Sequence, residues 1–548
     1  MQSKELEIRT LSSLAKVFPE RIYGKAQRSA HSFLGAELSF QIALRMNSDA
    51  HTKTDYEVRV ISRLNNITLY KVGLVPSVFP AYPSKENKDY ITTQGGIFPD
   101  PLLPLEKNIF RAASYKWRSL WVSVKIPETA TPGSYAIKLE FYKDGKKMGE
   151  SRFNITVHSV KLPKSNFLYT NWFHCDCIAD VHGVKIFSEK HWSLIEEYMS
   201  LAAQHGMNMI LTPVLTPPLD TEVGAERPTV QLVEVEKAGG VYHFDFSRLK
   251  RYIEIAKKYG IEHFEINHFF TQWGAEFTPK VIAKVEGKIK KIFGWHTPAL
   301  SADYTDFLSA LIPSLTSFFE SMGIPRENLY FHVSDEPYAN HLEHYQKVSS
   351  LMKPLIEGCR QLDALSSYAF YERGLVETPV VATNHIIPFI EADVDNLWCY
   401  YCCSQHQNVS NRFFAMPQER NRIIGVQMYK FGIKGFLHWG YNFYYTYLSR
   451  RVVNPYLETD AGEIYPSGDA FCVYPHKNGA IPSLRLKVFS EALSDMRLLS
   501  LLEKKIGKEK VEKELDRLMG ESITFETSSP KANFFNELYD MIFSYLDN

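Results

Sequence analysis

The sequence predicts a multidomain protein in which an N-terminal antiparallel β-sandwich is followed by a (β/α)8 barrel of the TIM type. Three observations lead to this prediction. The chain has 548 residues, too many for one compact hydrophobic core. Residues 1–160 show short, partly alternating apolar runs. From residue 165 onward, apolar runs alternate with segments of helical period.

The N-terminal part, residues 1–160, contains runs rich in Val, Ile, Phe and Tyr. Turn signals separate them, including Thr131-Pro132-Gly133 and Asp144-Gly145. This pattern is typical of an antiparallel sandwich. The stretch 160–165, with two lysines and a proline, is the expected linker. We expect strands at 36–46, 56–64, 119–126, 134–142 and 151–158.

Residues 165–505 alternate between short apolar runs and helical stretches. Eight strands with helices between them predict a (β/α)8 barrel, and a doubly wound parallel sheet is the alternative. Residues 506–548 are expected to form charged helices that pack outside the barrel. We expect strands near 167–173, 208–212, 263–267, 330–333, 367–370, 380–383, 397–402 and 435–439. The expected helices are 188–205, 247–259, 302–322, 339–355, 417–431 and 484–505.

Composition restricts the classes of function. Lysine and arginine together number 62, as do aspartate and glutamate, so the formal net charge is zero. A neutral chain argues against nucleic acid or an anionic membrane surface as the partner. No stretch approaches the length of a membrane span. The 14% of aromatic residues suits a cleft that stacks on the apolar face of a sugar ring.

Two features bear on the cellular compartment. The first residues, Met1–Glu7, are charged and lack the apolar core of a signal peptide. The seven cysteines are few and odd in number, which fits reduced thiols better than a disulfide framework. We therefore expect a cytoplasmic protein. An exported protein is the alternative if a leader peptide has been removed.

The sharpest motif places two carboxylates at the end of an apolar strand. In a (β/α)8 barrel the carboxyl ends of the strands form the mouth of the active site. Adjacent side chains on a regular strand point to opposite faces, so Asp335 and Glu336 can share a pocket only if the strand is distorted there. The alternative is a plain helix cap, with Asp335 near the N-cap. The motif reads Tyr330-Phe331-His332-Val333-Ser334-Asp335-Glu336-Pro337.

Other strand ends offer residues for sugar binding. The last barrel strand ends in aromatic and amide side chains, which supply a stacking wall and hydrogen-bonding tips. An aromatic core plug is the alternative for this strand. Polar residues at the other strand ends suit contacts with sugar hydroxyls, and a core or loop role is their alternative. The candidate substrate-binding residues are His174, Asn267, Tyr401, Trp439, Tyr441 and Asn442.

Metal binding is a weaker interpretation. The segment from His174 to Cys177 contains ligand-type residues but lacks the paired spacing of a zinc site. We expect no metal ion and no other cofactor. A metal-dependent barrel hydrolase, the alternative, would have to use the scattered residues His174, Asp176, His268 and Asp335.

Several stretches of the chain carry a likeness to a known family. Three of them are His332-Val333-Ser334-Asp335-Glu336-Pro337, Gly435-Phe436-Leu437-His438-Trp439-Gly440-Tyr441-Asn442 and Tyr465-Pro466-Ser467-Gly468-Asp469-Ala470-Phe471. Further stretches are 473–475, 481–486 and 491–496, with weaker ones in the sandwich at 121–127 and 132–135. Over residues 165–505 the chain resembles glycoside hydrolase family 123, the β-N-acetylgalactosaminidases.

The resemblance implies a retaining exo-glycosidase that releases terminal β-linked N-acetylhexosamine, in particular N-acetylgalactosamine, from a glycan or glycoconjugate. It implies substrate-assisted catalysis, in which the 2-acetamido oxygen attacks the anomeric carbon and an oxazolinium-like intermediate forms. By position, Glu336 would be the general acid and then the base, and Asp335 would orient the acetamido group. We accordingly expect a raised pKa for Glu336 and an ionised Asp335. A non-catalytic carbohydrate-binding barrel is the alternative.

Overall fold

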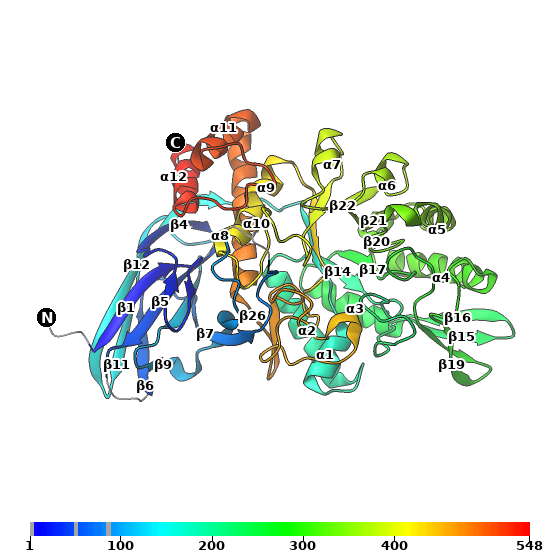
Figure 1. Cartoon of the computed structure of the whole chain (residues 1–548), viewed down its shortest axis with the longest axis horizontal. Coiled ribbons are helices and arrows are strands. Elements are labelled where there is room, and N and C mark those ends of the chain that lie inside the picture. Colours follow the sequence, from blue (N-terminus) through cyan, green and yellow to red (C-terminus); the bar gives the residue numbers. More distant parts are fainter. Residues whose placement is uncertain (1–4, 49–52, 84–88, 548) are drawn as a thin grey trace.

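The chain folds into a β-sandwich and a barrel that lie side by side, with helices at the C-terminus (Figure 1). The computed structural model describes residues 5–48, 53–83 and 89–547. Two largely antiparallel sheets precede an eight-stranded parallel barrel, so the predicted fold class is confirmed. Within the described ranges, no helix is long and apolar enough to cross a bilayer. Residues 1–4, which contributed to the expected absence of a signal peptide, lie outside these ranges.

The sandwich consists of two five-stranded sheets that face each other through an apolar core. Phe40 and Phe153, one from each sheet, stack with ring centroids 4.1 Å apart. The first sheet has the order β1 (Leu6–Ser12), β5 (Glu37–Met46), β10 (Arg118–Lys125), β7 (Ile67–Ser77) and β8 (Gly96–Pro104). The second has the order β4 (Ser29–Leu34), β12 (Lys146–Lys161), β11 (Gly133–Lys143), β6 (Lys53–Ile61) and β9 (Ile109–Ala113).

The barrel strands are short and almost entirely buried, as parallel strands covered by helices are. Between the first and second strands, the N–H of Asn208 donates to the carbonyl of Tyr169 over 3.3 Å. The Asn208 side chain accepts the N–H of Tyr169 in return, over 2.9 Å. In chain order the strands are β13 (Leu168–Asn171), β14 (Met209–Thr212), β17 (His263–Ile266), β20 (Leu329–Phe331), β21 (Arg360–Leu365), β22 (Thr378–Ala382), β23 (Trp398–Tyr400) and β24 (Gly435–His438).

One predicted barrel strand was wrong. The segment 367–370 is not a strand, because Ala369–Glu372 forms the short helix α6. The fifth strand lies earlier, at Arg360–Leu365. Its sequence conceals it, because three of its six residues are polar: Arg360, Gln361 and the fully buried Asp363. The other seven expected strands overlap strands of the structure.

A small four-stranded sheet that we did not predict is inserted between β14 and β20. Its strands are rich in Lys and Glu and largely exposed, so they lack the apolar runs by which the barrel strands were recognised. In spatial order they are β16 (Val241–Asp245), β15 (Glu234–Ala238), β18 (Val281–Val285) and β19 (Lys288–Phe293).

Helices cover the outside of the barrel (Figure 1). Each predicted helical stretch contains helix, with ends that differ by a few residues, and the stretch 417–431 divides into α8 and α9. The helices are α1 (Cys175–His182), α2 (Glu189–Gln204), α3 (Ser247–Lys258), α4 (Ala302–Ser321), α5 (Leu342–Leu355), α6 (Ala369–Glu372), α7 (Ile387–Glu391), α8 (Gln418–Arg422), α9 (Ile424–Lys430) and α10 (Leu484–Ile506).

Two further helices, α11 (Lys508–Met519) and α12 (Phe534–Leu546), end the described chain. α11 is charged, as expected, but α12 is largely apolar and contacts the sandwich. The ring of Phe543 stacks on that of His158 in β12, with centroids 3.7 Å apart. The domain division at 1–160, 165–505 and 506–548 stays a prediction.

A buried ion pair and buried hydrogen bonds join the sandwich to the barrel. Arg485 of α10 binds both carboxylate oxygens of Asp100 in β8, at 2.9 and 2.8 Å. The ammonium group of Lys16 donates to the carbonyls of Phe414 and Met416, each over 2.6 Å. The sandwich thereby binds a barrel loop that lies close to the cavity described below.

Candidate active site

Asp335 and Glu336 follow β20 at the carboxyl end of the barrel and line one cavity. On a regular strand they would point to opposite faces. The backbone of Glu336 is left-handed, with a φ of +43°, which is uncommon for a residue other than glycine. This distortion turns both carboxylates toward the same space, as the sequence required.

Asp363 of β21 holds the distorted strand end in place. Its Oδ1 accepts the N–H of Val333 over 3.0 Å and that of Ser334 over 3.2 Å. The hydroxyl of Tyr345 donates to Oδ2. The buried carboxylate takes the place of a neighbouring strand's carbonyl groups. The chain can therefore leave regular pairing just before Asp335 without orphaned N–H groups.

Each catalytic candidate has its own neutral donor. Gln272 donates from Nε2 to Asp335 Oδ2 over 2.8 Å. The hydroxyl of Tyr400, at the end of β23, donates to Glu336 Oε1. Asp335 is only 6% exposed, so these donors stabilise negative charge in a site that water hardly reaches.

The two carboxyl groups are hard to ionise together. Burial, reinforced by the negative charge of Glu336, raises the pKa of Asp335 to about 8, and the hydrogen bond from Gln272 opposes this. Burial also raises the pKa of Glu336, against the donor effect of Tyr400. We expected an ionised Asp335, but with the pKa of Asp335 at about 8 the pair retains a proton near neutral pH.

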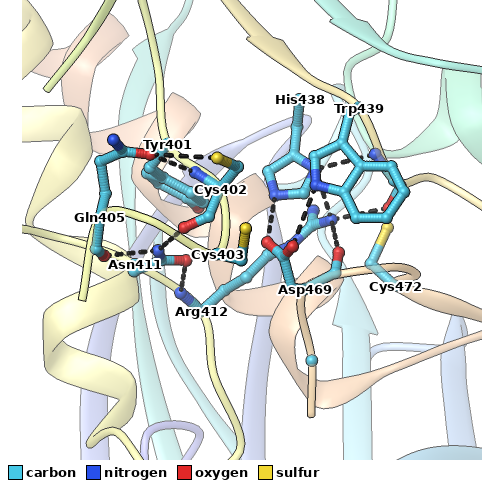
Figure 2. A network of polar contacts seen from close by, with 12 residues as sticks. Tyr401, Cys402, Cys403, Gln405, Asn411, Arg412, His438, Trp439, Asp469 and Cys472 are labelled. Atoms are coloured by element: carbon cyan, nitrogen blue, oxygen red, sulfur yellow. Dashed lines mark hydrogen bonds and ion pairs between the residues drawn. The ribbon is translucent and has the colours of Figure 1, made fainter. Parts of the chain in front are cut away.

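Trp439, just beyond β24, forms part of the cavity wall, and a hydrogen bond to Asp469 fixes its side chain (Figure 2). Its Nε1–H donates to Asp469 Oδ2 over 3.0 Å. Arg412 binds the backbone on both sides of this pair, donating to the carbonyls of Gly440 over 2.7 Å and Asp469 over 3.1 Å, and it also donates to His438 Nδ1 over 2.9 Å. The indole therefore has little freedom to change its orientation.

His174 also lines the cavity, but the groups around it do not form a metal site. The guanidinium of Arg227 binds both oxygens of Asp176, at 2.8 and 2.9 Å, and donates to His174 Nδ1 over 3.2 Å. Burial and the adjacent Arg227 lower the pKa of His174 to about 4, so its ring is neutral. An arginine cation already occupies the position that a metal ion would need.

His268, His332 and Asp363 form a second cluster with ligand-type atoms, inside the barrel. The two imidazoles stack face to face, with centroids 4.0 Å apart and planes 18° apart. One ion cannot lie in both ring planes. Although burial opposes it, the carboxylates of Asp363 and Glu265 raise the pKa of His332 to about 9. A protonated His332 thus supplies the positive charge there, and the cluster does not fit a metal ion.

The sequence matches the family model for the glycoside hydrolase 123 catalytic domain over residues 172–502, more than half of the chain. The chain belongs to glycoside hydrolase family 123. As a family 123 member, it is an enzyme that hydrolyses glycosides. The matched region contains every residue that lines the cavity around Asp335 and Glu336.

Comparison of structures shows the same fold in a family 123 glycoside hydrolase from Clostridium perfringens, studied for glycolipid glycan hydrolysis. The TM-score is 0.73 at 15% identity, with 99% of this chain and 98% of that chain covered. A β-D-glucuronidase from Dictyoglomus thermophilum has a TM-score of 0.34 at 9% identity, with coverages of 90% and 98%. A GH5 xyloglucanase from Bacteroides ovatus has a TM-score of 0.31 at 7% identity, with coverages of 85% and 98%. The search among curated proteins found no match.

The structure of this family 123 hydrolase brings four of the sequence-predicted site residues to the cavity: Asp335, Glu336, His174 and Trp439. The other four are buried and bonded to the protein itself. Asn267 and Asn442 bind backbone groups, Tyr441 donates to the carbonyl of Tyr198, and Tyr401 donates to Asn421. Their positions do not support direct contact with a sugar.

Several cavity residues were not among the predicted site residues of the family 123 hydrolase, including Tyr400, Gln272 and Asp220. At the end of β23 we predicted Tyr401 and not its neighbour Tyr400, because strand alternation alone does not say which tyrosine faces the barrel interior. Gln272 and Asp220 lie in loops, where neither periodicity nor a motif marks them.

Proposed function

We propose that this family 123 hydrolase is a retaining exo-glycosidase that releases terminal β-linked N-acetylhexosamine by substrate-assisted catalysis. The supporting observation is the adjacent pair Asp335 and Glu336, turned into one cavity and served separately by Gln272 and Tyr400. The assignment to N-acetylgalactosamine rests on the resemblance to the family.

In the first step, the carbonyl oxygen of the 2-acetamido group attacks the anomeric carbon. The bond to the leaving oxygen breaks as Glu336 protonates that oxygen, and a cyclic oxazolinium ion forms. In the second step, Glu336 removes a proton from water, which attacks the anomeric carbon and opens the ring. Two inversions give net retention of configuration.

Asp335 has a distinct role in this scheme. Its carboxylate accepts the N–H of the acetamido group, which orients the attacking oxygen and stabilises positive charge on nitrogen. This hydrogen bond favours the ionised form of Asp335 when the substrate is bound. The proton of the pair then resides on Glu336, where the leaving oxygen needs it.

The test is a panel of nitrophenyl β-glycosides with and without the 2-acetamido group. We expect cleavage of N-acetylhexosaminides only, inhibition by a thiazoline analogue of the intermediate, and no effect of a metal chelator. Rapid cleavage of a plain β-galactoside would overturn the substrate-assisted mechanism. Release of the α-anomer as first product, detected by NMR, would overturn retention.

A further inference from the structure

A third carboxylate, Asp220, lines the same cavity. It lies in the loop between β14 and β15 and is only 6% exposed. Its backbone is left-handed, with a φ of +42°, although a side chain is present. A left-handed backbone is uncommon outside glycine, although aspartate tolerates it better than most residues, and such conformations are concentrated at functional sites. The fold therefore maintains Asp220 in this place at some cost to stability.

The carboxylate of Asp220 is poorly supplied with donors. Oδ1 accepts the N–H of Leu448 over 3.3 Å and the hydroxyl of Tyr465 over 3.2 Å, both long contacts. Oδ2 is buried and has no hydrogen-bond partner among the described residues. A buried carboxylate with a free oxygen is costly unless a ligand supplies the missing donor.

Asp220 is also connected to the catalytic pair. Its backbone N–H donates to Oε1 of Gln272, and Nε2 of the same amide donates to Asp335 Oδ2. The N–H of Asp220 therefore fixes which end of the Gln272 amide faces Asp335. Asp220, Gln272 and Asp335 follow one another along one side of the cavity.

We propose that Asp220 determines sugar specificity, by accepting hydrogen bonds from the ring hydroxyls at C3 or C4 of the bound N-acetylhexosamine. This inference rests on the proposed function, which places the C2 acetamido group at Asp335. The anomeric carbon C1 then faces Glu336 and C2 faces Asp335. The hydroxyls at C3 and C4 extend away from Glu336, toward Gln272 and Asp220. Rotation about χ2, which is soft in aspartate, lets Oδ2 turn toward them.

The alternative role of Asp220 is that of a nucleophile in a two-carboxylate mechanism. That role predicts turnover of glycosides that lack the acetamido group. It also predicts that hydroxyls at C3 and C4 matter no more to the wild-type enzyme than to an Asp220 variant. Both predictions are opposite to ours.

The experiment compares the wild type, Asp220→Asn and Asp220→Ser on nitrophenyl N-acetyl-β-galactosaminide, its gluco epimer, and its 3-deoxy and 4-deoxy analogues. We expect Asp220→Asn to lower kcat/KM on the parent by about 100-fold, since it removes a charged acceptor from a buried site. In the wild type, one deoxy analogue should lose a similar factor. In the Asp220 variants, kcat/KM for that same analogue should be close to kcat/KM for the parent substrate.

Glu222→Gln is the matched control, because Glu222 is an exposed neighbour paired with Arg450. It should behave as the wild type on every substrate, and thermal unfolding should show that all variants are folded. If removal of a hydroxyl lowers kcat/KM by the same factor in the wild type and in the variants, the role of Asp220 is overturned while the proposed function stands. If the wild type cleaves no N-acetylhexosaminide, the proposed function fails, and the assignment of Asp220 fails with it.

Discussion

Gln272 donates to Asp335 over 2.8 Å while its carbonyl oxygen is held by the N–H of Asp220. One neutral amide thus stabilises the ionised form of the carboxylate assigned to the acetamido group. The donation is the main hydrogen bond that opposes the effect of burial on the pKa of Asp335.

Replacement of this amide tests the relationship. Gln272→Ala should raise the pKa of Asp335, so the ionised form appears only at higher pH. The kcat/KM profile should therefore move to higher pH, with a loss of about 10-fold at neutral pH. Gln204→Ala, on the exposed face of α2, is the control. An unchanged profile would contradict the prediction.

Removal of the Tyr400 hydroxyl should affect the general acid. The donated hydrogen bond lowers the pKa of Glu336, so Tyr400→Phe should raise this pKa further and move the kcat/KM profile to higher pH. The rate should fall by about 10- to 100-fold. Tyr401→Phe is a closely matched control, because the Tyr401 hydroxyl contacts Asn421 away from the cavity. Equal pH profiles for the two variants would remove Tyr400 from this role.

Asp335→Asn should reduce kcat by about 100- to 1,000-fold, because the neutral amide cannot stabilise the positive charge that develops on the acetamido nitrogen. KM should change much less, since the shape of the side chain is preserved. Steady-state kinetics on a nitrophenyl N-acetylhexosaminide measures both constants. A loss confined to KM would show that Asp335 binds the ground state only.

His332 should make stability depend on pH. Its pKa is raised to about 9 in the folded chain, above its ordinary value of 6.5. The stabilisation is therefore fully present below about pH 6.5 and is lost as the pH rises through about 9. Thermal unfolding of the wild type and His332→Gln between pH 5 and 10 should show a difference in Tm that shrinks toward alkaline pH. A constant difference would mean that His332 is neutral.

The sequence predicted the structure correctly where the residue pattern of a single strand or helix was sufficient. An apolar strand followed by Asp335 and Glu336 predicted both the fold position and the need for a distorted backbone. Where the outcome depended on neighbours, prediction failed. Asp363 looks like a surface residue until the N–H groups of Val333 and Ser334 and the hydroxyl of Tyr345 are seen around it.

The same limit explains the substrate-binding candidates. Tyr401 and Asn442 lie in the expected segments, but their roles follow from internal partners contributed by distant parts of the chain. Asp220 and Gln272 reach the cavity through loops whose path depends on the assembled barrel. Local sequence patterns contain no information about such long-range encounters.

The contact of Lys16 with the carbonyls of Phe414 and Met416 limits how the protein can be shortened. The region that matches the family begins at residue 172, so a fragment cut there would leave these carbonyls without the ammonium that binds them. Arg485 would likewise lose Asp100. The loop so exposed continues into Arg412, which donates to the carbonyls of Gly440 and Asp469, next to Trp439 and its partner. The catalytic barrel therefore depends on the sandwich for its structure, and a shortened protein made for engineering must retain both domains.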